Sequence, residues 1–284
     1  MIRTAVIGPG RVGTALAIAL PDVYEVGAVV GRGAAALARF TASVPSAVAQ
    51  PLAQATRSAQ LVLICVPDDQ LESVVRSAVR GDGVSEGSRW VHTSGAHGAG
   101  ALRPARLAGA AVAACHPAQT FPDPQAGAHS LAGASWAVTA AHPDRRWALD
   151  LVSDLGGRAE VIPERSRTLY HTALTLGSNG TSSIVTVSRE LLLAAGVADP
   201  AAFLQPLART SADNAARAGA AALTGPVRRG DAATVAAHVA ELRTVFPEAL
   251  EAYSALARLA LSQARRAGLA ADRAAAVDRA LEAG

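Results

Sequence analysis

Two hydrophobic patterns divide the chain. Up to about residue 162, short apolar runs alternate with segments in which apolar residues recur every three or four positions. The run at 61–66, Leu-Val-Leu-Ile-Cys-Val, has no polar position, which is typical of a strand covered on both faces of a parallel sheet. Alternating strands and helices predict an α/β domain with a doubly wound sheet. The predicted strands are 3–7, 25–30, 44–48, 60–66, 89–93, 110–115, 134–139 and 158–161, and the predicted helices are 11–20, 34–40, 69–79 and 144–155.

After residue 162 the strand patterns nearly vanish, and Ala, Leu and Arg recur with helical spacing. The first helix, 164–195, would be unusually long for a globular protein. We therefore expect two directly joined domains, an α/β domain at 1–162 and an all-helical domain at 163–284. Glycine, proline or a polar loop interrupts the helical pattern at Gly196, Pro200, 224–231, Pro247 and Gly268.

Composition narrows the class of protein. Half of the residues are hydrophobic and 17% are charged, which is enough apolar material for buried cores. No apolar run is long enough to span a bilayer, and the first residues lack the pattern of a secretory signal. Cys65 and Cys115 fall in predicted core strands. We therefore expect a reduced, cytoplasmic protein without a membrane span.

The basic residues are unusual because all 26 of them are arginine and the chain has no lysine. The net charge is only +3, and the arginines are scattered among acidic residues. They form no stripe with interleaved aromatic residues, so we expect no nucleic-acid binding. The absence of lysine also removes a common catalytic group.

The clearest chemical signal is the sequence Gly-Pro-Gly-Arg-Val-Gly at 8–13, between the first predicted strand and helix. In dinucleotide-binding folds the first glycine permits a tight turn, the second lets the backbone approach a pyrophosphate, and the third lets the helix pack on the strand. The phosphates lie at the helix N-terminus. A glycine turn without a ligand is the alternative. We predict a Rossmann domain that holds a dinucleotide through Gly8, Gly10, Arg11, Val12 and Gly13.

The end of the second predicted strand selects the dinucleotide. Enzymes that use NAD usually carry Asp or Glu there, to bind the ribose 2′-hydroxyl. This strand instead ends in Val-Val-Gly-Arg at 29–32, with no acid. The guanidinium of Arg32 can pair with the 2′-phosphate of NADP, and Arg39 is a second candidate. We predict NADP(H), with a solvated surface arginine as the alternative.

Three more strand ends face the same predicted crevice. After the fourth strand, Val66 and Pro67 are expected to contact the cofactor, whereas Asp68 or Asp69 caps the next helix. The fifth strand is followed by Ser94, which we expect to contact both cofactor and substrate.

The sixth predicted strand is followed by His116 and, three residues later, by Gln119, a candidate substrate-binding residue. We expect His116 in a loop at the crevice edge, where structural and functional roles are equally open. The histidines and cysteines show none of the H-x-x-x-H, H-E-x-x-H or C-x-x-C spacings, so we expect no metal site.

Two polar segments of the helical domain are candidate substrate contacts. His171, Thr175 and the pair 178–179 recur at helical spacing and share one stripe. Asn179 lies between two glycines, which are poor helix formers, so a close approach is expected there, with helix–helix packing as the alternative. In the polar loop 224–231, Arg229 could recognise a carboxylate, and Asp231 is a candidate N-cap.

The order of the motifs resembles one family across nearly the whole chain. The motifs are G-x-G-x-x-G, V-G-R, V-P-D-D, H-T-S-G-A and H-P-x-Q-x-F, then Y-H-x(7)-N and T-G-P-x-x-R-G-D. This order resembles the Rossmann-like oxidoreductases with a C-terminal helical domain of unknown function (type 2520). They are relatives of 6-phosphogluconate dehydrogenase, ketopantoate reductase and pyrroline-5-carboxylate reductase. The resemblance implies an NADP-dependent reductase of a small carboxylate, with 2-dehydropantoate as first candidate and a cyclic imine such as pyrroline-5-carboxylate as second.

One departure from the wider superfamily bears on the mechanism. Its members often carry a lysine one helical turn before an asparagine, and here Asn179 matches the asparagine while Thr175 stands at the lysine position. The remaining candidate proton donors are His171, which we favour, and His116, which would orient the substrate. A non-catalytic NADP-binding sensor or scaffold is the alternative that the missing lysine favours.

We expect Asn179 to bind the substrate oxygen, in a site between the two domains. Ser94, Gln119, Thr175 and Arg229 are the expected substrate-binding residues. The helical domain carries more apolar surface than one layer of packing can bury, so we also expect a homodimer.

Overall fold

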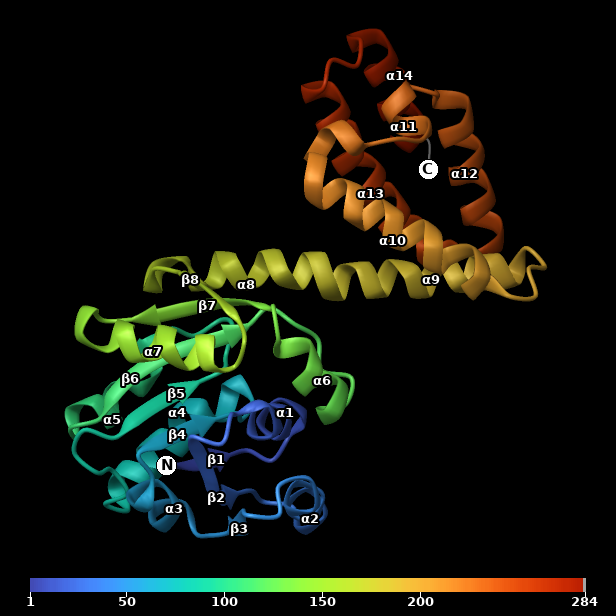
Figure 1. The fold of residues 1–284 in the computed structure, drawn as a ribbon. Coiled ribbons are helices and arrows are strands. Elements are labelled where there is room, and N and C mark those ends of the chain that lie inside the picture. Colours follow the sequence, from blue (N-terminus) through green and yellow to red (C-terminus); the bar gives the residue numbers. More distant parts are fainter. Residues whose placement is uncertain (283–284) are drawn as a thin grey trace. The chain divides into compact units, whose positions relative to one another are not determined.

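The computed structural model describes residues 1–282 and divides into two compact units (Figure 1). The first unit is Met1–Leu176, and the second begins at Gly177. The first unit therefore contains the predicted α/β domain together with residues 163–176, the start of the predicted helical domain.

The first unit is built on one eight-stranded sheet, with the strand order β3-β2-β1-β4-β5-β6-β7-β8. All neighbouring strands are parallel except β6 and β7, which pair antiparallel. The predicted fold class, a doubly wound Rossmann domain followed by a helical domain, is confirmed. The strands are β1 (Ile2–Ile7), β2 (Tyr24–Val30), β3 (Val48–Ala49), β4 (Leu61–Ile64), β5 (Arg89–His92), β6 (Ala111–Pro117), β7 (Ser135–Ala140) and β8 (Arg158–Val161).

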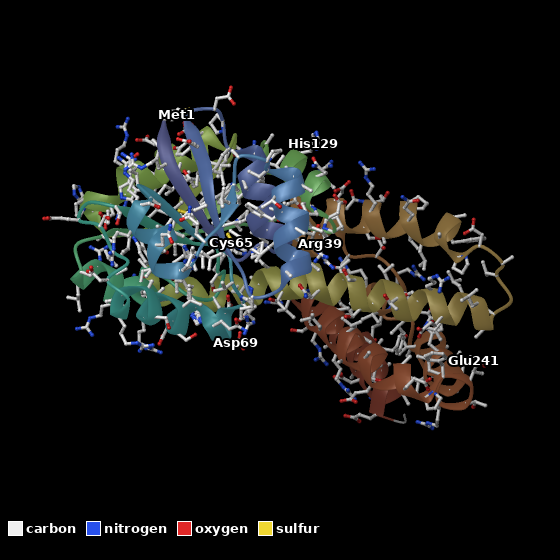
Figure 2. The ribbon with its side chains drawn as sticks, turned by 90° about the horizontal axis from the view of Figure 1, so that it is seen from below. Met1, Arg39, Cys65, Asp69, His129 and Glu241 are labelled. Atoms are coloured by element: carbon white, nitrogen blue, oxygen red, sulfur yellow. The ribbon has the colours of Figure 1, made fainter. Side chains whose placement is uncertain are left out.

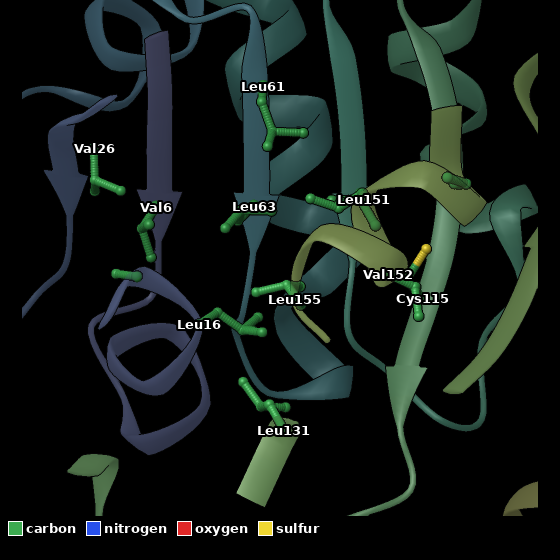
Figure 3. Packing of buried hydrophobic residues seen from close by; sticks show 14 of the residues in the cluster. Val6, Leu16, Val26, Leu61, Leu63, Cys115, Leu131, Leu151, Val152 and Leu155 are labelled. Carbon is green, nitrogen blue, oxygen red and sulfur yellow. The ribbon is translucent and has the colours of Figure 1, made fainter. Parts of the chain in front are cut away.

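Helices cover both faces of this sheet. Alternate residues of β1 show this, because Val6 packs into one core and Ala5 and Ile7 pack into the other. Figure 3 shows the first core, where Leu16 and Leu151 from two helices meet the strands. The helices of this unit are α1 (Arg11–Ala19), α2 (Ala34–Ser43), α3 (Leu52–Ser58), α4 (Asp68–Arg80), α5 (Arg103–Leu107), α6 (Pro124–Leu131), α7 (His142–Asp154) and α8 (Arg167–Thr175).

The structure corrects three sequence predictions in this unit. The strand predicted at 44–48 is only the two-residue β3, because Val44 and Ala47 are buried in the turn before it. The prediction that His116 lies in a loop is wrong, since β6 continues through Pro117. The strand at 134–139 is confirmed but its direction is antiparallel, because α6 packs on α1 and does not carry the chain back across the sheet.

The long helix predicted at 164–195 is helical but is not one α-helix. One 3₁₀ turn, Glu164–Ser166, precedes α8, and one turn of π-helix, Leu176–Gly180, separates α8 from α9 (Thr181–Ala194). The π turn holds the two glycines and Asn179, which are poor α-helix formers. The boundary between the two units falls inside this turn.

The second unit is helical and has its own core. Val227, Val235, Leu261 and Val277 are buried together in this core. None of the helices in the described chain is long and apolar enough to cross a membrane. Besides α9, the helices are α10 (Pro200–Ala218), α11 (Pro226–Arg229), α12 (Ala232–Val245), α13 (Pro247–Arg266) and α14 (Ala271–Glu282).

Candidate functional site

A cavity of about 1130 Å³ lies at the carboxyl ends of β1, β2 and β4. This edge of an open α/β sheet is where such folds bind ligands. Arg39 and Cys65 both line the cavity, and Figure 2 labels their positions. Of the predicted cofactor residues, the lining contains Gly8, Gly10, Arg11, Arg32, Val66 and Pro67.

The glycine loop is closely packed at two of its three glycines and open at the third. Gly8 has a φ of +103°, and a Cβ there would lie 2.4 Å from the carbonyl oxygen of Cys65. A Cβ on Gly13 would lie 2.2 Å from the carbonyl oxygen of Gly8. A Cβ on Gly10 would meet no atom within 4 Å, so the space beside this glycine at the cavity wall is open. The first and third glycines are thus needed by the protein itself, and the second leaves room for a ligand.

The N-terminus of α1 opens on this loop without a protein acceptor. No side chain caps it at Gly10, and its first turn holds no acidic residue. By contrast, Asp123 caps α6 and Asp231 caps α12 through hydrogen bonds to backbone N–H groups. The uncapped N–H groups and the positive end of the helix dipole suit a pyrophosphate.

Three guanidinium groups make the cavity cationic. Arg11, Arg32 and Arg39 line it, and none of their guanidinium groups has a hydrogen bond or ion pair within residues 1–282. The lining has one acid in the described chain, Asp123, whose carboxylate accepts the N–H of Ala126. Because no acid stands at the end of β2, the site fits a 2′-phosphate better than a free 2′-hydroxyl.

Other predictions around the cavity have mixed outcomes. Gly13 is buried and Val12 half-buried behind the loop, and neither lines the cavity. The prediction that Asp68 or Asp69 caps α4 is wrong, because the N-cap is Pro67 and no side chain caps this helix. Both carboxylates lie in the first turn of α4, where the helix dipole favours negative charge.

A second polar cluster forms where β6 meets α8. The Nδ1 atom of His116 is hydrogen-bonded to the hydroxyl of Tyr170 at 2.9 Å. The rings of His116 and His171 meet edge to face, with centroids 6.0 Å apart. The structure thus brings both predicted catalytic histidines together within the first unit.

Gly95 makes this approach possible. A Cβ on Gly95 would lie 2.5 Å from Cδ2 of His171 and 3.0 Å from Nε2 of His116. Any side chain at this position would therefore displace one of the rings. The loop after β5 and both histidines consequently form one packed group.

His92, the last residue of β5, is hydrogen-bonded to two residues of the loop after β5. It is fully buried, its Nε2 donates to the carbonyl of Gly98, and its Nδ1 accepts the N–H of Ser94. Burial lowers the pKa of His92 to about 4. This histidine is therefore neutral at pH 7, with one tautomer set by its two partners.

His116 is also held neutral. Burial, together with repulsion from the neighbouring His171 and Arg167, lowers the pKa of His116 to about 4 against a smaller opposing effect of Asp68. Burial raises the pKa of Tyr170, against an opposing effect of Arg167. At pH 7 the group presents a neutral imidazole bonded to a neutral phenol, which can orient a polar substrate group.

The remaining predicted substrate residues are more dispersed. The hydroxyl of Ser94 accepts the N–H of His97 and so shapes the loop beside His116. Ser94 does not line the large cavity. The side chain of Gln119 accepts the N–H of Thr120 and donates to the carbonyl of Ser130 at 3.4 Å. Thr175 is exposed near the end of α8.

Asn179 and Arg229 belong to the second unit. Asn179 is exposed in the π turn. Arg229 lines a pocket of about 660 Å³ in the helical unit together with Arg228 and Arg273. The prediction that Asp231 is an N-cap is confirmed, because its carboxylate accepts the N–H of Thr234.

Sequence reasoning missed one residue of the polar cluster. Arg167 is buried beneath Tyr170, with its guanidinium carbon 5.9 Å from the centre of that ring. The signal was the spacing of Arg167, Tyr170 and His171 at i, i+3 and i+4, which places all three on one helix face. In the described residues, no group of three or more His, Cys, Asp or Glu side chains is arranged to hold a metal ion.

Comparison with known families agrees with this architecture. Residues 1–117 match the family described as Rossmann-like domain, and residues 134–260 match the family described as Domain of unknown function (DUF2520). The chain therefore carries a Rossmann-like domain followed by a DUF2520 domain, as its motifs predicted. No curated protein sequence matches the chain significantly.

Several solved structures share the fold over nearly the whole chain. A provisionally assigned NADP oxidoreductase of Bacteroides fragilis is 21% identical, with a TM-score of 0.77 over 91% of this chain and 97% of that one. A protein of Thermotoga maritima is 21% identical, with a TM-score of 0.68 over 93% and 98%. An imine reductase of Myxococcus stipitatus in complex with NADP⁺ is 18% identical, with a TM-score of 0.64 over 92% and 94%.

Proposed function

We propose that this protein is an NADPH-dependent oxidoreductase that reduces a small oxo acid, with 2-dehydropantoate as the first candidate substrate. The observation that carries the proposal is the cationic cavity. The glycine loop, the uncapped N-terminus of α1, Arg32 and Arg39 all line it. The similar structures include NADP⁺ and NADPH complexes, which supports the same cofactor here.

The chain's own residues account for binding of this cofactor. The N-terminus of α1 at Gly10 and Arg11 would hold the pyrophosphate, and Arg32, with Arg39 also in the lining, would hold the 2′-phosphate. Val66 and Pro67 supply apolar contact at the end of β4. When bound, the cofactor supplies a hydride to a carbonyl or imine carbon.

The second cluster supports the assignment of proton donor and substrate-orienting group. His116 has a pKa of about 4 through burial, so at pH 7 it has no imidazolium proton to give and serves to orient the substrate. We assign the proton donor as His171, whose ring meets that of His116. We assign Asn179 to the substrate oxygen, and the remaining substrate contacts to Ser94, Gln119, Thr175 and Arg229.

A cyclic imine such as pyrroline-5-carboxylate is the second candidate substrate. The specific observation in its favour is the set of similar structures, which includes two imine reductases and a reductive aminase of Aspergillus terreus with NADPH. A 2-oxo acid and pyrroline-5-carboxylate each carry one polarised C=O or C=N carbon and one carboxylate. The carboxylate is bonded to the reacting carbon in the oxo acid and lies across the ring nitrogen in the imine, so both need a hydride donor and a carboxylate contact at slightly different spacing.

The test is NADPH oxidation by the purified protein against a panel of 2-oxo acids and cyclic imines, followed by absorbance. We expect one class to be turned over and 2-dehydropantoate to give the highest kcat/KM. Preferred turnover of the cyclic imines would select the second candidate. NADPH binding without turnover of any compound would instead support a non-catalytic NADP sensor or scaffold.

We also propose that 163–284 forms the substrate and dimerisation domain and that the protein is a homodimer. Helix α9 has no buried residue, and in α10 only Pro200 is buried within the described chain. These helices expose Ile184, Leu193, Phe203 and Leu207, with Phe203 and Leu207 more than 60% exposed. Apolar side chains gathered on two long helices favour a second copy as partner.

A further inference from the structure

Arg167 is a buried cation without a carboxylate partner. It is only 1% exposed, and it forms no ion pair within the part of the chain that the structure describes. Glu164 acts on it only electrostatically, and the carboxylate of Glu164 accepts the N–H of Gly100. Buried charges in proteins are normally paired, so the position of this guanidinium needs a reason beyond packing.

Neutral acceptors from three segments surround the guanidinium instead. Nε donates to the hydroxyl of Thr139 at 2.8 Å, and Nη2 donates to the carbonyl groups of Ala114 and Ala137 at 2.9 and 3.0 Å. Nη1 reaches the carbonyl of Ser94 at 3.5 Å. One side chain on α8 thus binds β6, β7 and the loop after β5.

The two bonds of Nη2 go to residues that are neighbours of His116 in the sheet. Ala137 is the residue paired with His116 across the β6–β7 ladder, and Ala114 precedes His116 on the same side of β6. The guanidinium therefore fixes the backbone on both strands next to this imidazole.

The same helix face also holds the ring itself. Tyr170 is one turn after Arg167, its ring lies over the guanidinium, and its hydroxyl is bonded to Nδ1 of His116. The fixed planar fork of arginine can reach all these acceptors at once, whereas the single ammonium of lysine cannot.

We infer that Arg167 is a positioning residue of the site, which acts with Tyr170 to hold the imidazole of His116 and the loop at Ser94 in one arrangement. Its catalytic consequence rests on the proposed reductase function, but the arrangement itself does not. The charged and titratable groups that face His116 are Arg167, Tyr170 and His171 from α8, and Asp68 from α4.

The test compares Arg167→Lys and Tyr170→Phe with wild type, and uses Arg165→Lys, an exposed arginine before α8, as matched control. The first readout is the NMR spectrum of the His116 ring, which reports the tautomer and its titration without any substrate. The second is the split between kcat and KM on a substrate from the panel. Melting temperature and NADPH affinity monitor the fold.

Both variants should shift the ring signals of His116, although within the described chain Arg167 has no hydrogen bond or cation–π contact with that ring. Tyr170→Phe should lower kcat roughly 2- to 12-fold, as expected for loss of one hydrogen bond, and Arg167→Lys by at least as much. KM should change less, and NADPH affinity and the control should stay at wild-type values.

Unchanged His116 signals in a folded Arg167→Lys variant would overturn the inference. If Arg167→Lys does not fold, the Tyr170→Phe variant tests the inference. Unchanged His116 signals in Tyr170→Phe would equally overturn the inference. Absence of turnover in wild type would count against the proposed function alone, since the NMR readout needs no substrate.

Discussion

Gly95 is the residue at which the packing of the site leaves no room for a side chain. A Cβ would lie 2.5 Å from the ring of His171 and 3.0 Å from that of His116. We expect Gly95→Ala to displace these rings and lower kcat roughly 10-fold or more, because small misplacements of reacting groups are costly. NADPH affinity should stay within about 2-fold of wild type, since Gly95 does not line the cofactor cavity.

The matched control for this variant is Gly27→Ala in β2, where an added Cβ meets no atom within 4 Å. Steady-state kinetics on the best substrate of the panel measure both variants. Wild-type kcat in Gly95→Ala would show that the contact between the loop and the histidines has no role in turnover.

His92 and His116 predict how stability depends on pH. Burial lowers both pKa values to about 4, from 6.5 in the unfolded chain. Above pH 6.5 both histidines are neutral in either state, and as the pH falls from about 6.5 to about 4 only the unfolded chain gains their protons. The free energy of unfolding should therefore fall with pH in this window, by about 1.4 kcal/mol per unit for each histidine.

Urea unfolding followed between pH 7 and pH 4 measures this slope. His92→Gln keeps a donor for Gly98 and an acceptor for Ser94 but does not titrate, so it should remove about half of the histidine contribution. Equal slopes in wild type and His92→Gln would refute the buried, neutral state of His92.

At this scale the sequence located the residues that line the large cavity better than those of the buried polar cluster. The glycine loop and Arg32 are readable because a turn between strand and helix demands particular residue types. The spacing of Arg167 to Tyr170 and His171 places it on their helix face, but the burial of this arginine was not readable, because no local pattern indicates that a charged side chain will be buried. The predicted strand ends at Cys115 and leaves His116 in a loop, whereas β6 continues through Pro117.

The elements of the first unit follow closely from hydrophobic patterning. All eight predicted strands have a counterpart, because continuous apolar runs are strong signals for strands buried on both faces. Strand direction was less accessible, since the antiparallel pairing of β7 depends on where α6 packs and not on any local period. The shortness of β3 has a similar origin in the turn that buries Val44.

The π turn at Leu176–Gly180 is the element on which the helical half of the proposed site depends. It interrupts the helix at Asn179, and π turns inside α-helices occur frequently at functional sites. If Asn179 binds the substrate oxygen, Asn179→Ala should lower kcat about 10²- to 10³-fold, as for other preorganised donors. NADPH affinity should remain within a few-fold of wild type.

The control for Asn179→Ala is Thr186→Ala, which removes an exposed hydroxyl bonded only to the carbonyl of Ser182 in the same helix. Circular dichroism checks that both variants keep their helix content. A kcat near wild type in Asn179→Ala would exclude this residue from the reaction.

The exposed apolar residues of α9 and α10 predict that the whole molecule is a dimer. Light scattering at micromolar concentration should give about twice the chain mass of 28.7 kDa. Phe203→Arg combined with Leu207→Arg should yield the monomer, because charge on an apolar interface is costly to bury. Leu107→Arg, at a leucine of the first unit that is more exposed than either, should remain dimeric. A wild-type monomer would refute the dimer.

The central claim for the whole molecule is that the cationic cavity of the first unit binds NADPH in preference to NADH. Titration calorimetry of both cofactors against wild type, Arg32→Ala and the exposed control Arg145→Ala tests it most directly. Wild type should bind NADPH about 10- to 150-fold more tightly than NADH, from one charge-assisted contact, and Arg32→Ala should lose most of that preference while Arg145→Ala keeps it. Equal dissociation constants for the two cofactors in wild type, or binding of neither, would contradict the account.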